Sequence, residues 1–181
     1  MPKPLPISQL GDPILRQTAQ PIYQIQEDWV QSLIADMLVT MQEANGVGIA
    51  APQVGQPYRL LIVASRPNLR YPNAPTMEPT VMINPHILNH STEMVSDWEG
   101  CLSIPGIRGQ VPRYQQVEVE YTTPDGKLQQ QLLTDFVARI FQHEFDHLNG
   151  SVFLDHMEDI HNLMTDQEYL KRVVQTIGSA N

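Results

Sequence analysis

The sequence predicts an α+β fold in which mostly antiparallel strands surround one central helix. Strand-like segments precede that helix without a repeating strand–helix–strand pattern, which argues against a parallel sheet. Residues 117–121 alternate apolar with polar side chains and are followed by a turn and by residues 128–133, as in a hairpin. Residues 135–148 have the period of a helix with one apolar face. A helix near each terminus completes the predicted fold.

Composition limits the class of protein. The chain has 181 residues, 41% hydrophobic and 17% charged, which suits one domain over residues 1–181 with a buried core. A net charge of −9 argues against direct nucleic-acid binding. The sequence contains neither an apolar span of about 18 residues nor a signal-peptide core. We therefore expect no membrane partner and a cytoplasmic location; an organelle location would follow if a transit segment had been removed.

The N-terminal part is expected to hold an arm and a helix. Residues 1–24 are rich in proline, which disfavours a long helix, so we predict an extended arm that wraps over the body. A first helix is predicted from about Glu27 to Asn45, before the helix stop Gly46. Its buried stripe recurs every four residues, at Trp29, Leu33, Met37 and Met41.

Small residues dominate the segment 46–53, Gly-Val-Gly-Ile-Ala-Ala-Pro-Gln. A phosphate loop is disfavoured, because the segment follows a helix and lacks the lysine of such loops. Two interpretations stay open. The segment is either a tight helix-to-strand connection or a substrate-facing edge formed by Gly46, Val47 and Gly48, with Gln53 as its polar group.

The middle and end of the chain contain strands and a short helix. Strands are predicted at 60–64 and at 80–84, the second ending at Pro85, with a proline-rich loop at 65–79 between them. The chain's only cysteine, Cys101, lies in 97–106, where we expect an exposed ligand on a loop or strand end. A capping box at 165–168 opens a C-terminal helix predicted over 165–176.

The central helix, Asp135 to Leu148, contains His143-Glu144-x-x-His147 and ends before Gly150. Two histidines four residues apart lie on one helix face and can bind one ion, with the glutamate as a general base. A chance match is the alternative. However, all three polar residues fall on the apolar face, where they need a partner, and one metal ion supplies it.

A soft third ligand for that ion is available in Cys101. One thiolate with two imidazoles suits Zn²⁺, Fe²⁺, Ni²⁺ or Co²⁺. An ion pair between Asp146 and Arg113 is expected from charge. The remaining histidines have no spacing that ties them to the site, and we expect ordinary surface or loop positions for His86, His90, His156 and His161.

Three motifs together resemble the signatures of peptide deformylases. They are Gly46-x-Gly48-x-Ala50-Ala51-x-Gln53, Glu99-Gly100-Cys101-Leu102-Ser103 and Gln142-His143-Glu144-x-Asp146-His147. Flanking matches extend the resemblance over about residues 10–157. It implies a hydrolase that removes the formyl group from the N-terminal methionine of nascent polypeptides and releases formate.

The resemblance also implies roles for residues. Cys101, His143 and His147 would bind the metal, with Fe²⁺ as the native ion, and a metal-bound water would attack the formyl carbon. Glu144 would be general base and acid, and Gln53 with the Leu102 amide would bind the oxyanion. We expect the substrate to be bound by Gly46, Val47, Gly48, Glu99 and Arg108, and nascent chains and the ribosome to be partners.

Two rival functions share the helix motif. A zinc endopeptidase would need a third ligand downstream of the helix, for which the sequence offers His156, Glu158 and His161. A metal-stabilised binding module would need no general base, so loss of Glu144 would leave its function unchanged.

Overall fold

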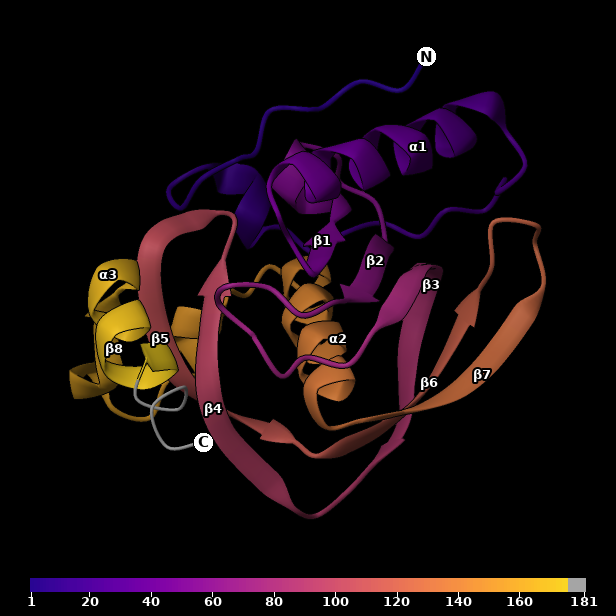
Figure 1. Ribbon diagram of the computed structural model, residues 1–181. Coiled ribbons are helices and arrows are strands. Elements are labelled where there is room, and N and C mark those ends of the chain that lie inside the picture. The colour runs from indigo at the N-terminus through magenta and orange to yellow at the C-terminus, as the bar shows by residue number, and fades with distance from the viewer. Residues whose placement is uncertain (176–181) are drawn as a thin grey trace.

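Two antiparallel sheets lie around a central helix, which confirms the predicted α+β class (Figure 1). The structure, a computed structural model, describes residues 1–175. The larger sheet has the order β1-β2-β3-β6-β7, formed by Gly48–Ala50, Leu60–Ser65, Met77–His90, Gln116–Thr122 and Leu128–Thr134. The smaller has the order β4-β5-β8, formed by Met94–Cys101, Ile104–Tyr114 and Leu163–Thr165. Helix α2, Asp135–Leu148, contacts strands of both sheets.

The first helix, α1, runs from Asp28 to Glu43, close to its predicted bounds. Leu33, Met37 and Met41 are buried against β1 and β2, as the four-residue period predicts. Trp29 differs, because its side chain is 40% exposed and packs on Tyr58 instead of entering the core. The helix thereby packs on the β1–β2 end of the larger sheet and fixes the position of β1.

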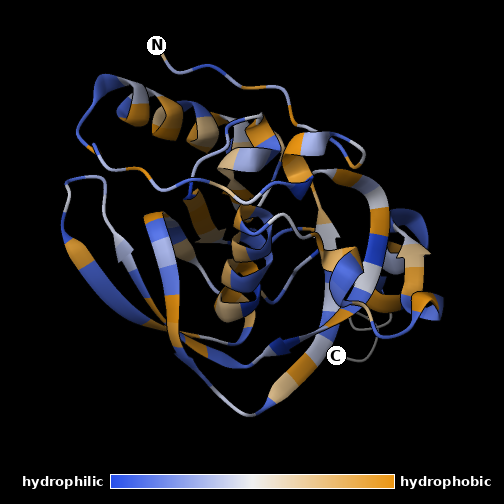
Figure 2. Cartoon of the chain, turned by 180° about the vertical axis from the view of Figure 1, so that it is seen from behind, coloured by the Kyte–Doolittle hydropathy of each residue, from blue (hydrophilic) through white to orange (hydrophobic). Residues whose placement is uncertain are grey.

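Hydrophobic and hydrophilic residues alternate along the long strands (Figure 2). The predicted hairpin is present as β6 and β7, with Val117 opposite Leu133 and Tyr121 opposite Gln129. Inward-facing residues of β6 and β7 meet Ala138 and Phe141 of α2 in one core cluster. The alternation of apolar and polar residues in β6 and β7 therefore gives the sheet an apolar face on which α2 packs.

Two predictions about strands need correction. The strand expected to end at Pro85 continues to His90, because the register shifts after Ile83 and the proline lies within that irregularity. Asn84 has a φ of 50° there, and its side chain bonds the backbone of Ile22 in the arm. Strands β4 and β5 were not predicted, since Asp97, Glu99 and Gly100 in β4 and two prolines and two glycines in β5 lower strand propensity.

The N-terminal arm wraps over the body as predicted. Backbone hydrogen bonds join Ser8 to Gln53, Leu10 to Ser103 and Ala19 to Leu148, at the end of α2. One short 3-10 turn, η1 (Pro13–Arg16), interrupts the extended course. The arm therefore contacts the segments that carry the candidate site.

The C-terminal segment pairs with the smaller sheet before it turns helical. Two 3-10 turns, η3 (Phe153–His156) and η4 (Ile160–Asn162), lead into β8 and then α3, Asp166–Tyr169, which continues as a π-helical stretch, Leu170–Val174. The Thr165 hydroxyl accepts from the Glu168 backbone N–H, so one half of the predicted capping box is present, whereas the Glu168 carboxylate pairs with Arg172. The predicted last residue, Thr176, lies outside the described residues. No helix within residues 1–175 has the length and hydrophobicity needed to cross a membrane.

Gly150 offers a test of how the arm is held to α2. Its φ is 72°, and an added Cβ would lie 2.7 Å from the Arg16 carbonyl oxygen. Gly55 has a φ of 73° with open space around it. We expect Gly55→Ala to cost about 1–2 kcal/mol of unfolding free energy from backbone strain, and Gly150→Ala to cost more. Urea unfolding measures both, and equal losses would show that the arm moves aside freely.

Candidate active site

Three potential metal ligands converge on the inner face of α2. The ligand atoms of Cys101, His143 and His147 lie within 4.8 Å of one another, and Cys101 Sγ is 3.3 Å from His147 Nε2. Cys101 ends strand β4, as the sequence suggested, but it is buried and not exposed. The burial follows from the strand pairing of β4 and β5, which carries Cys101 inward beside α2.

Gly100 lies next to Cys101 at the tight β4–β5 connection. The pairing register shifts between Gly100 and Cys101, so that Cys101 lies opposite Ile104. An added Cβ at Gly100 would lie 2.6 Å from Arg108 Cζ, so a larger residue would displace the guanidinium. Glycine at this position of the motif therefore leaves room for the Arg108 guanidinium.

The electrostatics of the ligand cluster favour a thiolate at Cys101. Burial raises the pKa of the Cys101 thiol, but the nearby His147 and the hydrogen bond with His143 outweigh it and hold the pKa well below its ordinary value. Burial lowers the pKa of His143, yet its bonds to Cys101 and Glu99 raise it well above its usual range. Without an ion, the Cys101 thiolate and a proton on His143 therefore stabilise each other. A divalent transition metal, which suits one thiolate and two imidazole nitrogens, would take the place of that proton.

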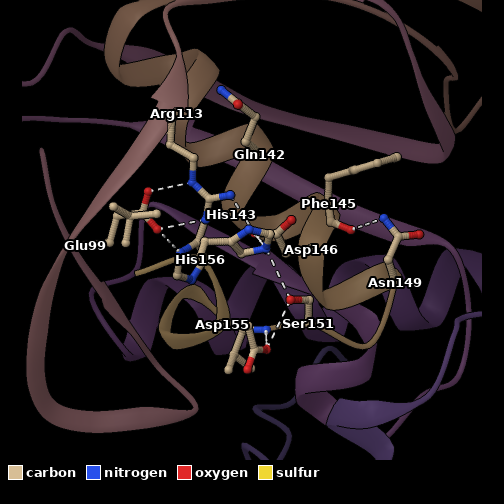
Figure 3. Close-up of polar contacts among 12 residues, drawn as sticks. Glu99, Arg113, Gln142, His143, Phe145, Asp146, Asn149, Ser151, Asp155 and His156 are labelled. Carbon is tan, nitrogen blue, oxygen red and sulfur yellow. Dashed lines mark hydrogen bonds and ion pairs between the residues drawn. The ribbon is translucent and has the colours of Figure 1, made fainter. Parts of the chain in front are cut away.

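A buried carboxylate fixes one of these imidazoles (Figure 3). Glu99 Oε2 accepts from His143 Nδ1 at 2.9 Å, which leaves Nε2 of the ring for an ion. Glu99 also accepts from Arg113 Nε at 2.9 Å and from Arg139 at 2.8 Å. Although burial raises the pKa of Glu99, Arg113 and His143 hold it well below its usual range. The carboxylate therefore bonds protein groups on both oxygens.

The chain of ion pairs continues toward the surface. Arg113 donates to Asp146 at 2.6 Å, which confirms the expected pair. His156 Nε2 lies 3.1 Å from the same carboxylate (Figure 3), so this histidine, which is exposed as expected, also joins the ion network. Sequence spacing could not reveal this contact, because His156 follows the helix in a 3-10 turn whose path depends on tertiary packing.

Glu144 has the environment of a proton-transfer group. Its side chain is buried, and burial raises its pKa to about 7. Within the described part of the chain, its Oε2 atom has no hydrogen-bond partner, and neither has Nδ1 of His147. Gly48 of β1 lies against it, because an added Cβ there would be 2.8 Å from Glu144 Cγ. A buried carboxylate oxygen without a partner implies that a ligand or water binds here.

Gln53 contributes an oriented amide on the same side. Its Oε1 accepts from the Ala50 backbone at 2.8 Å, so the side-chain NH₂ faces the cysteine. That nitrogen lies 3.5 Å from Cys101 Sγ and 3.3 Å from Ser103 Oγ. The residue is 1% exposed and sits in the turn η2, Ala51–Val54. The arrangement presents a fixed hydrogen-bond donor beside the ligand cluster.

One cavity connects these groups. Besides Cys101 and His143, the predicted site residues that line it are Gly46, Val47, Gly48, Gln53, Glu99, Leu102, Arg108 and Glu144. Aromatic residues that the sequence did not single out also line it: Tyr71, Trp98 and Phe136. Their positions depend on the loop after β2, on β4 and on α2, which lie together only in the folded chain.

The ligand set distinguishes between the rival hydrolases. Within residues 1–175, the residue that joins His143 and His147 in a ligand cluster is Cys101. Of the downstream candidates, His156 bonds Asp146 and His161 bonds Asp159. A third ligand upstream of the helix, on the adjacent sheet, does not fit the endopeptidase pattern.

Comparisons with known proteins agree with the motifs. A profile of the polypeptide deformylase family matches residues 4–163. A Nostoc protein named peptide deformylase 2 is 62% identical over 174 residues, covering 96% of this chain and 97% of the relative. The Met-Ala-Ser-bound crystal structure of a class I type b peptide deformylase from Acinetobacter baumannii has a TM-score of 0.85 at 48% identity, covering 87% of this chain and all of the other. An actinonin complex from Synechococcus elongatus has a TM-score of 0.77 at 36% identity, covering 97% and 86%.

Replacing the thiolate tests the ligand set. We expect Cys101→Ser to lose most of its bound metal, because a hydroxyl is a poor ligand for a soft divalent ion. The matched control is Glu144→Gln, which alters a buried neighbour that is not in the ligand cluster and should keep its metal. Metal content after dialysis, measured by mass spectrometry, checks both. Wild-type metal content in Cys101→Ser would contradict the ligand set.

Neutralising Glu99 tests the buried ion network. Glu99→Gln leaves the buried guanidiniums of Arg113 and Arg139 without that negative charge, so we expect a loss of about 3–5 kcal/mol in unfolding free energy. Asp155→Asn, at the partly exposed pair with Arg16, should cost less than about 1 kcal/mol. Urea unfolding of the metal-free proteins compares the two variants. Similar small losses would contradict this account of the network.

Proposed function

The chain belongs to the polypeptide deformylase family, and we propose that Cys101, His143 and His147 hold the metal ion on which its activity depends. Polypeptide deformylases remove the formyl group from the N-terminal methionine of new polypeptides, so the protein is a metal-dependent hydrolase of formyl-methionyl chains. The observation that carries the site assignment is the convergence of one thiolate and two imidazoles beside a buried carboxylate without a partner.

When bound, a divalent ion supplies a Lewis acid that lowers the pKa of a coordinated water toward neutrality. Of the ions that suit this donor set, Zn²⁺, Fe²⁺, Ni²⁺ and Co²⁺, we propose Fe²⁺ as the native one, as the family resemblance implies. Cys101, His143 and His147 would hold the ion with three protein ligands, the number that catalytic rather than structural sites use.

Glu144 is proposed as the general base and acid. Its Oε2 accepts a proton from the attacking water, and the same oxygen returns the proton to the amine that leaves when the C–N bond of the formamide breaks. The burial of the carboxylate, its lack of a partner and its raised pKa support this role.

Gln53 and the Leu102 amide are proposed to stabilise the negative charge that develops on the formyl oxygen. The side-chain NH₂ of Gln53 is held toward Cys101 before substrate arrives, so little reorganisation is needed. Leu102 directly follows Cys101 and lines the same cavity. Loss of one such donor typically raises the barrier by about 2.7–4 kcal/mol.

The substrate backbone is proposed to lie along Gly46, Val47 and Gly48 as an added strand, with its methionine in the cavity. The peptide bound in the Acinetobacter baumannii relative supports a peptide-end site. For Glu99, we replace the expected substrate contact with a positioning role, because its oxygens bond His143, Arg113 and Arg139.

The substrate also indicates where the enzyme works. Formylated N-termini belong to nascent chains, so we propose that it acts in the cytoplasm of a bacterial-type cell, close to the ribosome. Pelleting of the protein with translating ribosomes, compared with empty ribosomes, tests the second part of this proposal.

Formate release tests the proposed function directly. The wild-type protein, loaded anaerobically with Fe²⁺ or Ni²⁺, should release formate from formyl-Met-Ala-Ser. Glu144→Gln should keep its metal and lose about 10²–10⁴-fold in turnover, because proton transfer is impaired. Absence of turnover in the loaded wild type would contradict the function, and undiminished turnover in the variant would contradict the role of Glu144.

A further inference from the structure

Residues of the C-terminal segment reach the loop that borders the substrate cavity. We propose that Asp166 and Tyr169, here called the C-terminal clasp, hold loop 66–76 at the cavity and act as positioning residues for substrate binding. The loop joins β2 to β3 and runs across α2 (Figure 1). The proposal rests on the deformylase function above and assigns a role to a segment beyond the three motifs.

The first contact between the clasp and the loop runs through Arg108, which bonds both. Its side chain is 2% exposed, so its charge needs partners within the protein. Nε donates to Asp166 at 2.7 Å, and Nη1 donates to the Tyr71 hydroxyl in the loop at 2.6 Å. The guanidinium also faces the Tyr71 and Tyr169 rings, 5.4 and 5.2 Å from their centroids. Arg108, expected to bind substrate, is thus held between the clasp and the loop.

Tyr169 makes the second contact. Its hydroxyl donates to the Arg70 carbonyl oxygen of the loop at 3.1 Å, and its ring packs against Trp98 of β4. The residue is only 5% exposed, and burial raises its pKa to about 12, so the hydroxyl stays a donor at neutral pH. A direct hydrogen bond therefore joins the clasp to the loop backbone.

The loop side chain that Arg108 holds is itself part of the cavity wall. Tyr71 packs on Phe136 of α2, with ring centroids 4.9 Å apart, and both rings line the cavity together with Arg70 and Trp98. A shift of the loop would move this wall relative to Glu144 on the same helix. Releasing the clasp should therefore weaken substrate binding without changing the groups that perform the chemistry.

Two variants remove the two contacts separately. Tyr169→Phe deletes only the hydroxyl, and Asp166→Asn removes the charge opposite Arg108. Glu168→Gln is the matched control, because Glu168 lies between them in α3 and pairs with Arg172 on the surface. The measurements are KM and kcat for formyl-Met-Ala-Ser with Fe²⁺-loaded enzyme, metal content, and amide hydrogen exchange of residues 66–76.

We expect KM to rise about three- to tenfold in Tyr169→Phe, the range that one hydrogen bond supports, with kcat and metal content unchanged and faster exchange in the loop. Asp166→Asn should raise KM in the same direction, and Glu168→Gln should not. A wild-type KM in both clasp variants would overturn the proposal, even if these variants unfold more easily. An equal rise of KM in Glu168→Gln would also overturn it. An inactive wild type would instead refute the deformylase function.

Discussion

The burial of Glu99 is the constraint on which the site depends. A carboxylate removed from water needs compensating partners, and it finds them in Arg113 on β5 and in Arg139 and His143 on α2. These bonds tie β4 to β5 and to the helix. Since Cys101 follows two residues after Glu99 on the same strand, the carboxylate that orients His143 also sets where the thiolate lies.

The opposite side of the site is built from small residues and backbone. Gly48 passes so close to Glu144 that a Cβ would collide with it, and Gln53 is turned toward Cys101 by a bond from its own backbone turn. Helix α1 holds this edge in place by packing on β1 and β2. The close approach of the β1 backbone therefore brings the substrate edge next to the side chains of Glu144 and Gln53.

Segments outside the motifs complete the arrangement. The arm bonds the end of α2 through Ala19, and Arg16 pairs with Asp155, next to His156 of the ion network. At the other end, Asp166 and Tyr169 reach the loop beside the cavity through Arg108 and the Arg70 carbonyl. The N-terminal arm and the segment 166–169 are therefore linked to the helix or to the cavity wall, although neither carries a proposed catalytic group.

The sequence alone determined what local periodicity and spacing encode: helix α2 with His143, Glu144 and His147 on one face, its end before Gly150, the β6–β7 hairpin and a lone cysteine suited to a soft metal. Only the tertiary structure decided the pairing of β4 with β5, because both strands contain residues of low strand propensity. It also decided the burial of Cys101 and the partners of Glu99, Arg108 and His156. The reason is physical. Residues three and four apart in the sequence form one face of a helix, so the sequence alone predicts that face. The partners of a buried charge come from distant parts of the chain, and only folding brings them together.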